Sequence, residues 1–178
     1  MLAGARTFPP SGRISSVSTR DAPWLTEPEM RAWRALISST TGLLAVLDNE
    51  LQAAHGLSLG DYEVLVHLSE APAHSLRMSD LAGGLHLSPS GITRRIDGLV
   101  KHGLVERRQC PTDRRGSNAV LTRAGMQALK RAAPTHVRGV REHFVDRLSD
   151  RALANLASAL SNVEVDADLA RGGCDAEG

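Results

Sequence analysis

The stretch MSDLAGGLHLSPSGITRRIDGLVKHG, residues 78–103, decides the fold. Ser79 is expected to cap a short helix over Asp80–Leu85, and Ser88-Pro89 is a residue pair typical of the start of another. His102-Gly103 closes the second helix, because glycine suits the left-handed position after a helix end. Two short helices joined by a tight turn predict a helix-turn-helix.

The second of these helices has two different sides. Its apolar residues recur at helical spacing and form one stripe, made of Ile92, Ile96, Leu99 and Val100. The rest of its surface is polar and mostly basic. A DNA major groove admits one α-helix, and short hydroxyl side chains suit phosphates or base edges. We expect DNA contacts from Ser79, Ser88, Ser90, Thr93, Arg94 and Arg95.

Arg94 and Arg95 are expected to do different work. Consecutive residues of a helix point in different directions, since one turn takes 3.6 residues. We therefore expect one of the two to read bases and the other to contact the DNA backbone.

A β-hairpin follows the helix-turn-helix. Leu104–Arg108 and Asn118–Thr122 are short extended runs, and Gln109–Ser117 between them is a polar turn rich in arginine. A basic loop beside a helix in the major groove can reach the minor groove or flanking phosphates. We expect such contacts from Arg107, Arg114 and Arg115. Asp113 is expected to orient a neighbouring arginine through a charge-assisted hydrogen bond.

The charge distribution agrees with a polyanion-binding site. Residues 88–131 contain ten basic and three acidic side chains, a net charge of +7. The whole chain of 178 residues is only +1, so the remainder carries −6. A basic block on an otherwise acidic protein is typical of nucleic-acid binding.

Helices are predicted on both sides of this segment. One runs from about Thr26 to His55, and another begins at Ser58. A further helix follows Thr122, and Pro134 is expected to kink or split it near Ala133. Ser149 caps a last helix. The predicted organisation is a flexible arm (1–22), a helical dimerisation region (26–56 and 123–165), a winged helix-turn-helix (58–122) and a flexible tail (166–178).

The motifs together resemble the MarR family of bacterial regulators. The resemblance covers about residues 30–165. It rests on the Ser-Pro helix start, on Asp113-Arg114-Arg115 in the hairpin, and on Leu121-Thr122-Arg123-Ala124-Gly125 after it. It implies a mainly α-helical fold with a small β-hairpin wing. It also implies a homodimer whose first and last helices interlock and whose two lobes bind a pseudo-palindrome in double-stranded DNA. In many members a small aromatic or phenolic ligand weakens DNA binding, so a ligand-released repressor is the expected function.

Two alternatives stay open. Cys110 stands where family wings commonly have an acid, so a thiol-based redox regulator acting through Cys110 is one. A winged-helix protein-interaction module is the other.

Other classes of function are not expected. The chain has no nucleophile elbow or phosphate loop, which argues against an enzyme. Its histidines and its two cysteines lack metal-ligand spacing, so neither metal nor cofactor is expected. No signal peptide or membrane-spanning run is evident, and a cytoplasmic location is the default expectation.

Overall fold

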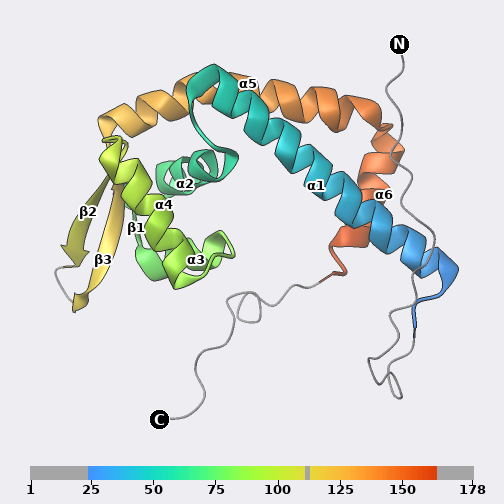
Figure 1. The fold of residues 1–178 in the computed structure, drawn as a ribbon, viewed down its shortest axis with the longest axis horizontal. Helices are drawn as coiled ribbons and strands as arrows, with labels where there is room; N and C mark the ends of the chain where they lie inside the picture. The colour runs from blue at the N-terminus through green and yellow to red at the C-terminus, as the bar shows by residue number, and fades with distance from the viewer. Residues whose placement is uncertain (1–23, 111–112, 164–178) are drawn as a thin grey trace, which may run out of the picture. The chain divides into compact units, whose positions relative to one another are not determined.

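The computed structural model describes residues 24–110 and 113–163. The chain divides into two compact units, Met1–Ile37 and Ser38–Gly178. In chain order the elements are α1 (Glu27–His55), α2 (Leu59–Glu70), a 3-10 turn (Pro72–His74), β1 (Ser75–Arg77), α3 (Met78–Gly84), α4 (Pro89–Lys101), β2 (Val105–Cys110), β3 (Asp113–Leu121), α5 (Arg123–His143), a second 3-10 turn (Val145–Arg147) and α6 (Asp150–Leu160) (Figure 1). The predicted mainly α-helical fold with a small β wing is confirmed. The predicted arm (1–22) and tail (166–178) lie outside the described residues.

The predicted helix starts are confirmed where a hydroxyl residue precedes the helix. The side-chain oxygens of Ser58, Ser88, Thr122 and Ser149 each accept a hydrogen bond from the backbone N–H three residues on, at 3.0–3.3 Å. Such caps satisfy amide groups that have no partner within the helix. Gly103 follows α4 with a φ of +71°, as expected for a residue after a helix end.

The prediction that Ser79 caps α3 is wrong. The helix begins two residues earlier than predicted, at Met78, and its N-cap is Arg77, whose side chain makes no capping hydrogen bond. Ser79 lies in the first turn, where its hydroxyl is 3.1 Å from the Asp80 carboxylate. The physical reason is that strand β1 runs directly into α3, so the strand fixes where the helix can start.

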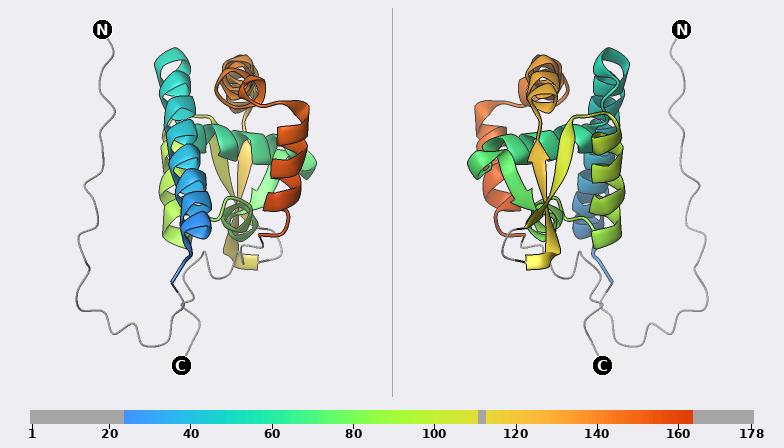
Figure 2. Two further views of the ribbon diagram at one scale, coloured as in Figure 1. Left: turned by 90° about the vertical axis from the view of Figure 1, so that its right-hand side faces the viewer. Right: turned by 90° about the vertical axis from the view of Figure 1, so that its left-hand side faces the viewer.

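A three-stranded antiparallel sheet replaces the predicted two-stranded hairpin. Its order is β1-β3-β2, so β3 pairs with both of its neighbours. The strands also extend further than predicted. The turn expected over 109–117 is mostly strand, with a register shift between Gln109 and Cys110. β2 and β3 run side by side, and β2 contacts α4 (Figures 1 and 2).

Pro134 does not split α5, which was one of the two effects predicted for it. α5 is a single helix, with Pro134 inside it. Ala132 and Thr135 on either side of the proline are buried, and α5 packs against α2. Packing of this kind holds a helix together although proline removes one backbone hydrogen bond.

The core of the second unit is aliphatic and centres on α2. Because the largest fully buried side chains come from α1, α2, α3, α4 and β2, these elements form one body. Those side chains are Leu51, Val64, Leu65, Leu68, Leu81, Ile92, Ile96 and Val105.

The Leu-Thr-x-x-Gly motif forms the joint between the sheet and α5. Leu121 is buried, and the Thr122 hydroxyl both accepts from Gly125 N–H at 3.0 Å and donates to the Gly103 carbonyl at 2.8 Å. A Cβ atom on Gly125 would collide with the Leu104 carbonyl oxygen. The leucine, the threonine and the glycine of the motif thus each help to join β3 to the start of α5.

Candidate nucleic-acid interface

The helix-turn-helix is built from α3 and α4. His86, in the turn between them, has a φ of +51°, and Leu87 N–H closes the turn on the Ala82 carbonyl at 2.9 Å. Ile92, Ile96 and Leu99 are at most 3% exposed, so one side of α4 is fixed in the core. The opposite side of α4 consequently faces outward.

The outward side of α4 carries four of the predicted DNA contacts. Ser88, Ser90, Thr93 and Arg94 lie on this side, and Ser90, Thr93 and Arg94 are exposed. The Ser88 and Ser90 hydroxyls lie 3.2 Å apart at the first turn of α4. Among the described residues, none lies within hydrogen-bonding distance of the Arg94 guanidinium. Arg94 is therefore available to an external partner.

Arg95 points elsewhere. Its Nη1 lies 3.4 Å from Asp61 Oδ1, and its side chain is only 30% exposed. The structure thus separates the two consecutive arginines, as expected. It gives Arg95 an intramolecular partner on α2, which the sequence did not indicate.

Arg107 joins the wing to α4. Its guanidinium donates to the Thr93 carbonyl at 3.2 Å and to Asp97 Oδ1 at 2.9 Å. Arg108, next along β2, pairs with Glu106 at 3.0 Å. Arg107 is thus engaged in holding the strand to the recognition helix.

The remaining wing residues are placed by backbone alone. Asp113, Arg114 and Arg115 form the start of β3. Their side chains lie outside the described residues, as does the side chain of Cys110. The contacts predicted for them remain predictions.

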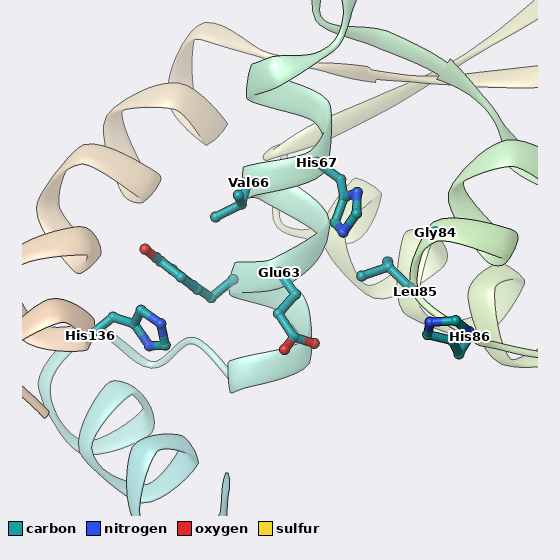
Figure 3. Close-up of a pocket in the computed structure, with 8 residues that line it drawn as sticks. Glu63, Val66, His67, Gly84, Leu85, His86 and His136 are labelled. Atoms are coloured by element: carbon teal, nitrogen blue, oxygen red, sulfur yellow. The ribbon is translucent and has the colours of Figure 1, made fainter. Parts of the chain in front are cut away.

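A pocket of about 370 Å³ lies beside the helix-turn-helix. Figure 3 shows Glu63, Val66 and His67 on α2, His136 on α5, and Leu85 and His86 in the turn before α4. The rings of Tyr62 and His136 are tilted against each other, with centroids 4.6 Å apart. The pocket is thus lined by both apolar and polar side chains, and the turn between α3 and α4 forms part of its wall.

Burial shifts the protonation of both ring residues. Desolvation lowers the pKa of His136, and the nearby Glu63 charge opposes this only in part. Burial raises the pKa of Tyr62 above its ordinary value of 10.0. The His136 Nδ1 atom is buried and has no hydrogen-bond partner in the described structure. The pocket therefore holds a neutral phenol next to an imidazole that favours its neutral form.

Comparison with known proteins identifies the family. The MarR family model matches residues 57–117. The transcriptional repressor YetL of Bacillus subtilis is 30% identical over 116 residues, which is 64% of this chain and 70% of YetL. The chain belongs to the MarR family. It is accordingly a member of a family of DNA-binding transcriptional regulators and not an enzyme.

Further relatives agree with this assignment. The transcriptional repressor MprA of Escherichia coli is 33% identical over 86 residues, which is 48% of this chain and 49% of MprA. Two solved structures of MarR family regulators from Streptomyces coelicolor superpose with a TM-score of 0.76. Sco3205, in complex with DNA, is 36% identical and matches 80% of this chain and 89% of its own. AbsC is 39% identical and matches 85% and 100%.

Two findings concern other kinds of site. Within residues 24–110 and 113–163, no helix has the length and apolar character needed to cross a membrane. In the same part of the chain, His, Cys, Asp and Glu side chains form no group of three able to hold a metal ion.

The partly buried His136 predicts a pH-dependent stability. Because the folded state lowers the pKa of His136, the unfolded chain binds more protons just below the ordinary value of 6.5. The free energy of unfolding should therefore fall as the pH drops through this region. Urea unfolding of His136→Gln between pH 5 and pH 8 should show a weaker fall. His102→Gln, which removes an exposed imidazole, is the control. Equal pH slopes for wild type and His136→Gln would exclude this role.

Proposed function

We propose that this protein is a homodimeric transcriptional repressor that binds a pseudo-palindromic operator in double-stranded DNA. The observation that carries the proposal is the two-sided α4. Its inner side is buried, and its outer side presents Ser88, Ser90, Thr93 and an exposed Arg94. Two relatives support the proposal, because YetL is a transcriptional repressor and Sco3205 was crystallised in complex with DNA.

The proposed contacts divide by what each residue can reach. Arg94 is the candidate for reading base edges, because bidentate pairing of arginine with guanine is specific. Ser88, Ser90 and Thr93 suit phosphates or base edges near the start of α4, and the exposed Ser79 suits a phosphate next to α3. In the wing we propose that Arg114 and Arg115 contact the flanking groove, with Asp113 orienting one of them.

Replacing a base-reading arginine and replacing a phosphate-binding arginine should have different effects on DNA affinity. Arg94→Ala should lower discrimination at one operator position by about 1–3 kcal/mol. Arg115→Ala should weaken all sequences alike and reduce the slope of log K against log salt by about 1. Gel shifts with the DNA upstream of its own gene, at two salt concentrations, measure both. Uniform weakening by Arg94→Ala would reassign that residue to the backbone.

The same gel shifts address the two alternative functions. No binding to any upstream or genomic fragment, with protein capture instead, would favour an interaction module. Loss of binding under peroxide that Cys110→Ser prevents would favour the thiol-based regulator. DNA binding that is insensitive to peroxide and to Cys110→Ser leaves the proposed repressor.

The dimer is proposed from apolar surface that the single chain leaves uncovered. α6 has apolar residues along one side, Leu153, Leu156 and Leu160, and no buried residue. α1 likewise leaves Leu44 and Val46 exposed. Monomers rarely expose apolar stripes of this kind, and a second copy would cover them. A two-fold dimer also suits half-sites about one helical turn of DNA apart.

Sedimentation equilibrium should therefore give twice the chain mass of 19.0 kDa. Leu160→Glu places a charge on the exposed stripe and should shift the protein toward monomer, because burying an unpaired charge is unfavourable. Circular dichroism checks that the variant stays helical. A wild-type chain that sediments at 19.0 kDa at micromolar concentration rules the homodimer out.

The ligand is proposed for the pocket formed by α2, α5 and the turn before α4. A small aromatic or phenolic molecule in this pocket would lie against the lining residues Tyr62, Val66 and His136. Leu85 and His86 in the pocket wall belong to the turn that sets α4. Contact with them connects occupation of the pocket to release of DNA.

Phenol, benzoate and salicylate are the probes for this site. At least one should displace operator DNA from the wild-type protein. His136→Gln changes a lining side chain without emptying the core, and it should weaken that response while retaining operator affinity within about threefold. The readout is fluorescence anisotropy of labelled operator. Absence of any response to all three, in anisotropy and in the melting temperature, counts against this ligand class.

A further inference from the structure

Arg95 makes its contacts with the first turn of α2. The Arg95 Nη1 atom lies 3.4 Å from Asp61 Oδ1 and 3.5 Å from Ser58 Oγ. Both side chains of the ion pair are about one-third exposed, at 30% and 31%. The contact bridges residues that are 34 positions apart in the sequence and so joins two separate helices.

The receiving end of this contact is itself well ordered by hydrogen bonds. Ser58 caps α2 by accepting from Asp61 N–H at 3.1 Å, and its hydroxyl donates to Asp61 Oδ2 at 2.7 Å. Leu59 N–H in the same turn donates to Asp48 Oδ1 on α1 at 2.7 Å. One carboxylate oxygen of Asp61 thus completes the cap, and the other is left to Arg95.

Gly60 makes room for the arginine. A Cβ atom built on Gly60 would overlap Nη1 of Arg95 and lie 2.5 Å from its Cζ. Any larger residue at position 60 would push the guanidinium away from Asp61. Gly60 sits in a helical turn with ordinary backbone angles, so the glycine is explained by the space that Arg95 needs and not by a special φ.

We infer that Arg95 is a positioning residue that sets the recognition helix α4 against α2, and that it does not contact DNA. This inference rests on the proposed function, because α4 is there the helix that enters the major groove. Ile92, Ile96 and Leu99 bury one side of α4 but are apolar and permit some sliding. Arg95 adds a directional contact near the middle of the helix, and it points in a different direction from the exposed Arg94.

The rival interpretation is that Arg95 leaves Asp61 and binds a phosphate in the complex. The two interpretations predict opposite effects of the Asp61→Asn substitution on operator affinity. If Asp61 holds Arg95 in a positioning contact, Asp61→Asn should weaken operator binding. If Arg95 is a phosphate ligand, Asp61→Asn removes a competing negative charge and should leave the affinity unchanged or raise it.

A double-mutant cycle separates these interpretations. We expect Asp61→Asn and Arg95→Gln each to weaken operator binding by about 5- to 30-fold, and the double variant to be no weaker than either single variant. The slope of log K against log salt should equal that of wild type. Additive losses, or a slope reduced by about 1 in Arg95→Gln alone, would overturn the inference. Arg94→Gln is the matched control, expected to change base preference.

Gly60→Ala tests the same contact with both charges present. The added methyl group should displace the guanidinium and reproduce the loss seen with Arg95→Gln, although alanine favours the helix. The melting temperature checks that Gly60→Ala is folded. Wild-type affinity in Gly60→Ala would contradict the positioning role.

Hydrogen exchange without DNA keeps the inference separate from the proposed function. Asp61→Asn and Arg95→Gln should each speed exchange of amides in α4 and in the first turn of α2, and the melting temperature should change little because partly exposed ion pairs contribute little stability. Unchanged exchange in α4 overturns the positioning role. If the wild-type protein binds no DNA, while amide exchange in α4 is still faster in the two variants, the proposed function is refuted and the positioning role of Arg95 stands.

Discussion

Burial of one side of α4 is the constraint on which the rest of the lobe depends. Ile92, Ile96 and Leu99 enter a core that α2 fills from the centre. Burial stabilises the fold by roughly 1.5–3 kcal/mol for each large aliphatic side chain. It fixes the rotation of α4 about its axis, so the opposite side of the helix must face solvent. Arg94 faces outward because it lies two residues from Ile92 and from Ile96, about half a helical turn away from each of these buried side chains. The polar face is thus a consequence of how the apolar face packs.

Structural elements that depend on interactions between residues close in the sequence could be predicted. The hydroxyl caps at Ser58, Ser88, Thr122 and Ser149 act within three residues, so a local pattern suffices to locate them. The glycine after α4 is equally local. For the same reason, the two-helix motif and the family resemblance could be recognised before any tertiary contact was known.

Features that depend on partners distant in the sequence were missed. β1 is three residues long and exists because Ser75–Arg77 pairs with Asn118–Val120 of β3. No local propensity predicts so short a strand. Its presence then moves the start of α3 ahead of Ser79. Likewise the helix α5 runs through Pro134 because packing against α2 outweighs a local preference for a break.

The net charge of residues 88–131 likewise could not show which arginines are available to DNA. Net charge counts every arginine alike, whereas the fold assigns them different tasks. Arg107 and Arg108 have acidic partners in the lobe, and Arg95 has Asp61. Among the described arginines of α4 and β2, Arg94 alone points away from any such partner. Positive charge therefore indicated the segment that we propose binds DNA, and the carboxylates decide which of these arginines is left exposed for it.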